Sequence, residues 1–262
     1  MALISKQSVL LLLLASLATI IIAGIVVGPI PQPQWYHDFA DQRSFLGIPN
    51  AWNVLSNIPF AVAGGWGLFL LLSPKRIQFV DRRERWPWVG VSVGLILTAL
   101  GSGYYHMAPD DYRLVWDRLP MTIIFMSFVA ALMTEKINVT LGLCLWPLFL
   151  GFGFYSVVQW YASELRGAGD LRLYVGVQIF TLAAILIMSL GPVVYSHSRD
   201  LVVVAVLFGL ARLFEMYDHQ IAFSEAAISG HTLKHLAAAF AGFWVIFMLG
   251  RRKIIGENFH EN

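Results

Sequence analysis

The stretch WVGVSVGLILTALGSGYYH, residues 88–106, contains no Asp, Glu, Lys or Arg. About 20 mostly apolar residues are needed to cross the hydrocarbon core of a bilayer, so this stretch predicts a transmembrane helix. Ser102 and His106 are four residues apart near its end and share one face of a helix. Ionisable groups are costly inside a membrane and are by default candidates for function. We therefore interpret residues 88–106 as a membrane helix with a functional site at one end.

Seven further stretches have the same apolar character. Of the 262 residues, 58% are hydrophobic and only 13% are charged, unlike the composition of soluble domains. Together with residues 88–106, the predicted spans are residues 9–27, 52–72, 119–133, 139–158, 171–190, 201–216 and 231–249. The sequence thus predicts an all-α polytopic membrane protein, with one membrane domain accounting for nearly the whole chain.

The cysteine content and the charge exclude several classes of protein. Cys144 is the single cysteine, so the chain has no internal disulfide framework and no Cys-based zinc site. The net charge is +2, and the basic residues lie between apolar segments rather than on one face, which does not indicate nucleic-acid binding. The lipid bilayer is the partner that this composition predicts.

Lysine and arginine are distributed unequally between the two sides of the predicted helices. One side has Arg43, Arg113, Arg118, Arg166 and Arg172, and the other has Lys6, Lys75, Arg76, Arg82, Arg83, Arg85, Lys136, Arg199, Arg251, Arg252 and Lys253. Since basic residues mark the cytoplasmic side, and eight helices place both termini on one side, we expect both termini to be cytoplasmic. The expected location is a bacterial inner membrane, with the site toward the outer (periplasmic or lumenal) leaflet. Residues 9–27 are longer than the apolar core of a signal peptide, so they are expected to be retained as a helix.

Four ionisable side chains are predicted to share one depth in this topology. His106 ends the third span, Asp117 precedes the fourth, and His231 and His235 lie in the first turns of the last span. Two histidines at i and i+4 can clamp a metal, and three histidines with a water form the usual catalytic zinc arrangement. The alternative is a set of buried polar residues that hydrogen-bond between helices.

Several motifs resemble the alkaline ceramidase family. They are Gly-Ser-x3-His-Met from Gly101, Asp-x-Leu-Pro-Met from Asp117, His-x3-His from His231, and Trp52-Asn53-Val-Leu-Ser56-Asn57. The resemblance covers about residues 41–239, and the wider group of seven-helix membrane hydrolases includes the adiponectin-type receptors. It implies a zinc amidase that cleaves the amide of ceramide or a similar N-acyl lipid. It also implies that the last seven predicted helices are those of the family, and that residues 9–27 are an addition.

The resemblance assigns a role to individual residues. It implies zinc ligands at His106, His231 and His235, a catalytic serine at Ser102, a catalytic aspartate at Asp117 and a further matching aspartate at Asp218. We expect Asp218 to orient a ligand histidine through its free ring nitrogen. The implied domains are residues 1–30 as an extra helix, 31–51 as an outer loop, 52–250 as the catalytic domain and 251–262 as a basic tail.

The chain departs from the family pattern at two places. The family builds a calcium site from acidic residues; here Asp38 and Asp41 are present, but Asn50 stands where the family has glutamate. Hard-cation affinity depends on the number of carboxylates, so a calcium site is in doubt. Arg118 replaces an acidic residue of the eukaryotic enzymes, and the headgroup preference of the family is therefore not transferred.

The residues predict a mechanism and leave alternatives open. Asp117 is placed to move a proton from zinc-activated water to the leaving amine, and Ser102 to donate to the oxyanion; a serine nucleophile is the rival role. Arg212 and Glu215 are interpreted as a mutually compensating or snorkelling pair rather than as cavity residues, and Lys234 is expected to face away from the site. The alternative function is a receptor or scaffold with a structural zinc site.

Overall fold

The computed structural model describes residues 3–73, 76–223 and 228–255, without the side chain of Phe223. Lys75 and residues 256–262 of the predicted tail lie outside the described residues. Within the described part, the chain is helical and β pairing is limited to two isolated bridges. The α-helices are α1 (Lys6–Val26), α2 (Ala51–Leu55), α3 (Ile58–Leu72), α4 (Arg85–Met107), α5 (Asp111–Lys136), α6 (Val139–Leu165), α7 (Arg172–Leu190), α8 (Asp200–Met216), α9 (Asp218–Phe223) and α10 (Gly230–Arg251), with 3₁₀ turns at Gln34–His37 and Arg82–Glu84.

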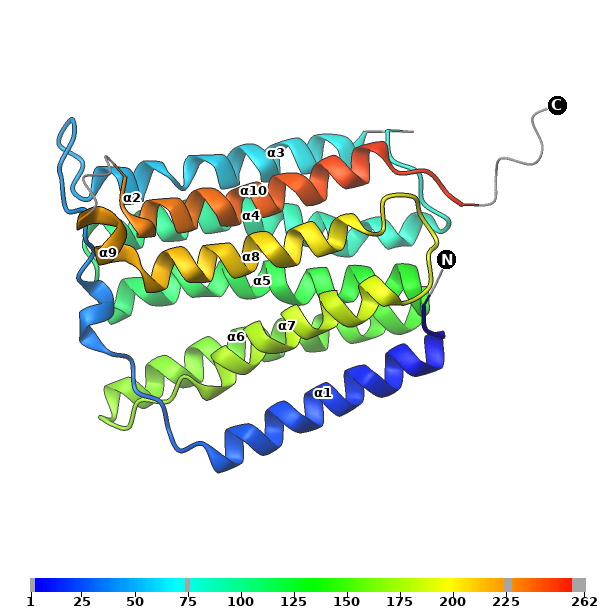
Figure 1. Ribbon diagram of the computed structural model, residues 1–262, viewed down its shortest axis with the longest axis horizontal. Coiled ribbons are helices and arrows are strands. Elements are labelled where there is room, and N and C mark those ends of the chain that lie inside the picture. The colour runs from blue at the N-terminus through cyan, green and yellow to red at the C-terminus, as the bar shows by residue number, and fades with distance from the viewer. Residues whose placement is uncertain (1–2, 74–75, 224–227, 256–262) are drawn as a thin grey trace.

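Seven helical units in the described residues are long and apolar enough to cross a membrane. They are α1, the combined α2 and α3, α4, α5, α6, α7 and α10. The prediction of an all-α multi-pass membrane protein is thus confirmed. We also predicted a span at residues 201–216; there α8 has 17 residues, at the short end of the roughly 17–25 that a membrane helix takes. Figure 1 shows α8 alongside α10 in the same bundle.

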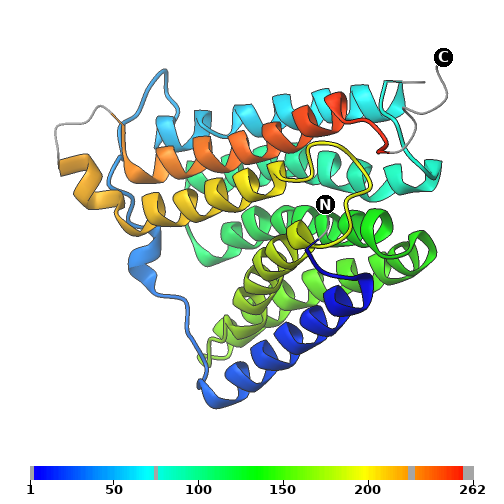
Figure 2. The ribbon, with the colours of Figure 1, turned by 45° about the vertical axis from the view of Figure 1, so that its right-hand side comes forward.

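The first helix, α1, stays at the edge of the bundle. It packs along α7, and both ribbon views place it away from α3 and α10 (Figures 1 and 2). Only Val9 and Leu13 of α1 are buried. Arg172 donates to the carbonyls of Gly24 and Val27 and so fixes the end of α1 at the start of α7. The segment that follows α1 crosses the ends of the other helices and leads to α2.

The helix α5 begins eight residues before the predicted span because its first two turns are polar. Asp110 is its N-cap, and the Asp110 carboxylate accepts from the Arg113 amide. Apolar composition detects only the part of a helix that contacts hydrocarbon or core. As a result, Asp117 lies inside the helix, where its position is fixed by a regular backbone.

Candidate metal centre

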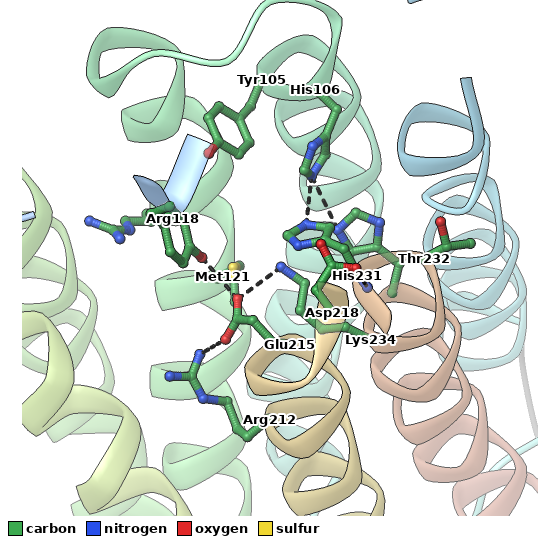
Figure 3. A network of polar contacts seen from close by, with 12 residues as sticks. Tyr105, His106, Arg118, Met121, Arg212, Glu215, Asp218, His231, Thr232 and Lys234 are labelled. Carbon is green, nitrogen blue, oxygen red and sulfur yellow. Dashed lines mark hydrogen bonds and ion pairs between the residues drawn. The ribbon is translucent and has the colours of Figure 1, made fainter. Parts of the chain in front are cut away.

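Three histidines from two helices meet where α4 ends and α10 begins. His106 lies in the last turn of α4, and His231 and His235 lie in the first turns of α10. All three side chains are buried, and one ring nitrogen from each lies within 4.8 Å of those of the other two. Figure 3 shows the ring of His106 directed at the two rings from α10. The structure thus brings together the three histidines that the sequence singled out.

Two of the three spacings between the ring nitrogens match those around a tetrahedral metal ion. His106 Nε2 lies 3.2 Å from His235 Nε2 and 3.4 Å from His231 Nε2. Ligands at about 2.0–2.1 Å from a tetrahedral zinc ion are roughly 3.3–3.4 Å from one another. A shared proton would satisfy only one pair of these nitrogens, whereas a cation satisfies all three. The donor set therefore fits zinc, and three buried histidines form a group that can bind a metal.

The Trp-Asn-x-x-Ser-Asn motif supplies a hydrogen-bond partner to Nδ1 of His235, the ring nitrogen that does not face the other two histidines. The Ser56 hydroxyl donates to the backbone carbonyl of Asn53, so it accepts a hydrogen from His235 Nδ1, 2.8 Å away. A proton on Nδ1 leaves the lone pair of His235 on Nε2, which faces the other imidazoles. The side chain of Asn53 accepts from the Thr232 hydroxyl and donates to the Asp41 carbonyl. This motif consequently sets both the tautomer of His235 and the position of the first turn of α10.

A strap formed by residues 34–41 covers the histidines. Phe39 is buried. The centre of its ring lies 4.7 Å from the centre of the His106 ring and 4.4 Å from that of the His231 ring. The Asp218 carboxylate accepts from the backbone N–H groups of Ala40 and His231, at 3.0 and 2.7 Å. This differs from our expectation that Asp218 orients a histidine ring. The first N–H groups of a helix lack intrahelical acceptors, and the carboxylate satisfies the one at His231.

Ser102 and Asp117 are brought together by a close approach of α4 and α5. A Cβ on Gly101 would lie 1.9 Å from the carbonyl oxygen of Trp116, so only glycine permits this crossing. Pro120 has no N–H to donate to that carbonyl, which leaves it directed at α4. The Ser102 hydroxyl and the Asp117 carboxylate line the same cavity, and both side chains are buried. The predicted serine and aspartate therefore lie on the wall of one cavity.

These residues line a cavity of about 490 Å³. Ser102, Asp117, His231 and His235 are part of its wall. The cavity continues between the helices to Val245, which lies about 15 Å beyond His235 along the axis of α10. Its remaining wall is mainly apolar, with Leu95, Phe125 and Phe128 among the lining residues. This shape accommodates a long apolar chain with a polar group near the histidines.

A charged cluster on the same cavity was only partly predicted. The Glu215 carboxylate accepts from Tyr36 Oη at 2.9 Å. It also accepts from Lys234 Nζ at 3.1 Å and from Arg212 (Figure 3). Arg212 and Glu215 form the mutually compensating ion pair that the sequence indicates. Both residues also line the cavity. Lys234, expected to face away, lines it too. Lys234 is three residues after His231, and residues at i and i+3 lie on neighbouring faces of a helix.

The residues considered for calcium have separate partners. Asp38 is exposed; the Asp41 carboxylate is paired with Arg43 at 2.6 Å; Asn50 donates to the His106 carbonyl. Hydrogen bonds from Arg43 hold the pKa of Asp41 below its ordinary value. Among the described residues, the three-histidine group is the one set of His, Cys, Asp or Glu side chains arranged for a metal ion.

No model of a known protein family matches the chain, and a comparison with curated proteins finds no match. The geometry of this site and the motifs in the sequence are therefore the observations that bear on function.

Proposed function

We propose that this protein is a zinc-dependent intramembrane amide hydrolase that cleaves the N-acyl bond of ceramide or a related lipid. The observation that carries the proposal is a group of three buried imidazoles, two of which line one apolar cavity together with Ser102 and Asp117. His106, His231 and His235 hold the metal. When bound, zinc supplies a Lewis acid that polarises an amide carbonyl and lowers the pKa of water to about 7.

The side chains beside the metal site move protons and stabilise charge. Asp117 takes a proton on its carboxylate and gives it to the nitrogen of the leaving amine, which departs as a neutral group. Ser102 donates its hydroxyl hydrogen to the oxygen that becomes negative when the carbonyl is attacked. The rival role of Ser102 as nucleophile needs a free base, and the three nearby histidines are committed to the metal.

The remaining features support a lipid substrate. The apolar part of the cavity takes the acyl chain, and the motifs that resemble alkaline ceramidases lie around it. We propose residues 52–250 as the catalytic domain, both termini in the cytoplasm and the histidines toward the outer leaflet. Labelling of single cysteines in a Cys144→Ser background tests this orientation: residue 113 should react from outside and residue 82 from the cytoplasm. The reverse pattern contradicts it.

The alternative is a receptor or scaffold with a structural zinc site. Structural zinc sites close with a fourth protein ligand, whereas catalytic sites keep one position open. In the described residues the group has three possible ligands, all histidines. Three protein ligands leave one position on a four-coordinate zinc ion open, which favours the hydrolase.

The test measures zinc content and release of fatty acid from N-acyl sphingoid and N-acyl amine lipids in micelles. The double variant His231→Ala/His235→Ala should lose most of its zinc and its activity. His197→Asn is the control, because His197 lies in the α7–α8 connection and asparagine tolerates its positive φ. Full zinc occupancy in the double variant contradicts the ligand assignment. A zinc-loaded wild type that hydrolyses no N-acyl lipid favours the receptor or scaffold.

A further inference from the structure

Arg118 is a buried cation that forms no ion pair with any described residue. Arg118 follows Asp117 in α5, and only 5% of its surface is exposed. Arg118 Nη2 donates to the Gln32 side chain at 2.6 Å. Its guanidinium carbon lies 4.1 Å from the centre of the Trp160 ring and 4.8 Å from that of Tyr174. Within the described residues, its Nη1 has no hydrogen-bond partner.

The aromatic rings compensate only part of the cost of this charge. A guanidinium over a ring face is stabilised only modestly. Leaving a charged group buried without an opposite charge costs more free energy than this gain, and a buried donor without an acceptor adds to that cost. A neutral side chain of similar size could fill the same space at a lower cost in free energy. A positive charge retained here therefore indicates an anionic partner that the chain itself does not provide.

None of the carboxylates that line the cavity forms an ion pair with Arg118 among the described residues. Glu215 accepts from three donors, including the cations Arg212 and Lys234, and Asp218 accepts two backbone N–H groups. Asp117 is required as a proton acceptor, and Asp38 is exposed. A neutral headgroup would leave the charge of Arg118 without an ion-pair partner.

The Arg118 side chain belongs to the wall of the cavity. Gln32, Tyr36 and Tyr174, which surround its guanidinium, also line that cavity. The Tyr36 hydroxyl connects this group to Glu215, to which it donates a hydrogen bond of 2.9 Å. The apolar part of the cavity extends away from the histidines along α10, so the amine half of an N-acyl lipid lies on the polar side, with Arg118.

We propose that Arg118 binds an acidic group on the amine half of the substrate. The natural substrates are then N-acyl lipids whose headgroup carries a carboxylate, a sulfonate or a phosphate. The nature of the bond that is cleaved rests on the proposed function, whereas the anion site does not. Arg118 acts as a specificity-determining residue, and a neutral lipid such as ceramide is the poorer substrate.

The kinetic test compares acidic and neutral substrates of one chain length. N-lauroyl glycine, N-lauroyl taurine and N-lauroyl O-phosphoethanolamine supply the three acids, and N-lauroyl ethanolamine is the neutral reference. For the preferred acid, Arg118→Gln should lower the ratio of kcat/KM, acidic over neutral, by about 10- to 100-fold, the range for a hydrogen bond to a charged group. Arg118→Lys should keep part of the preference. Arg113→Gln is the matched control, because Arg113 is on the same helix and pairs with Asp110 near the surface.

A ratio that is unchanged in folded Arg118→Gln, or a wild type that prefers the neutral amide, overturns the proposal. A binding arm needs no turnover: sulfonamide analogues of the glycine and ethanolamine lipids are compared by the shift in Tm of the purified protein. The acidic analogue should raise the Tm more than the neutral one. Equal shifts in the wild type overturn the proposal, even where Arg118→Gln does not fold. If the protein hydrolyses nothing but prefers the acidic analogue, the proposed function fails and the anion site stands.

Discussion

Buried charged and polar groups are paired differently at the two ends of the helices α5 and α10. At the end where α10 finishes, Arg252 pairs with Glu135 at 2.6 Å, and both side chains are nearly inaccessible. Trp88 donates to the same carboxylate, and Tyr195 donates to Glu84. At the other end, three imidazoles face one another without a carboxylate partner. The charge of Arg252 is compensated by Glu135, although Arg252 Nε and Nη2 lack hydrogen-bond partners. Three imidazole nitrogens that face one another have no such compensation among the described residues and can bind a cation. The difference separates the structural end of the bundle from the reactive end.

The largest effect on rate is expected at the reactive end, for Asp117→Asn. Asparagine keeps the size and hydrogen bonding but cannot take the proton, so kcat should fall by about 10²–10⁴-fold. Zinc content and Tm should change little. Ser102→Ala should cost less, on the order of 10²–10³-fold, if the serine only supports the oxyanion. Asp110→Asn is the control, since asparagine caps α5 as well as aspartate does. Unchanged amidase activity in both zinc-loaded variants would remove Asp117 and Ser102 from the mechanism.

The largest effect on stability is expected at the structural end, for Glu135→Gln. This change leaves the charge of Arg252 buried without a counterion, which costs about 3–5 kcal/mol. Chemical or thermal unfolding of the purified protein measures the loss, while zinc content should be retained. Asp200→Asn breaks the exposed pair with Arg251 at the same end and should cost at most about 1 kcal/mol. Equal losses for the two variants would mean that the Glu135 pair is not structural.

A smaller effect, on zinc affinity, is expected for Ser56→Ala, which removes the hydroxyl that accepts from Nδ1 of His235. Without it, the proton on Nδ1 keeps only the backbone of Asn53 as an acceptor, and zinc affinity should fall by about 10–100-fold. Competition with a chelator measures the change. Ser92→Ala is the matched control, because Ser92 is also buried but its hydroxyl bonds only the carbonyl of Trp88 in its own helix. The same chelator resistance in Ser56→Ala and the wild type would refute the tautomer assignment.

The smallest effect concerns pH and the strap over the histidines. The pKa of Asp41 is lowered in the folded protein, chiefly by hydrogen bonds from Arg43. A lowered carboxyl pKa stabilises the fold above the unfolded value of about 3.9, and this contribution is lost as pH falls through the folded value. The Tm of the wild type should thus decrease more than that of Asp41→Asn between pH 5 and pH 3, taken as roughly the window around that value. The difference should be small because Arg43 is largely exposed. Parallel curves would mean that the pair adds no stability.

Much of the candidate site could be predicted from the sequence because it depends on local spacing. His231 and His235 are one turn apart, and so are Ser102 and His106, whatever surrounds their helices. The sequence did not indicate the contact of Asp218 that the structure shows, in which its carboxylate accepts from the backbone N–H of His231. Where a side chain reaches across to another helix depends on how the helices cross, and spacing along one helix does not contain that information.

The sequence alone determined that the chain is a bundle of membrane helices with three histidines at one end. Apolar length and helical period are local properties, so they are visible without any contact between segments. Only the tertiary structure decided that Phe39 covers the histidines, that Glu215 joins Tyr36 to Lys234, and that Arg118 lies between aromatic rings. These contacts join residues up to about two hundred positions apart, and each depends on the close packing of whole helices and on the path of the strap.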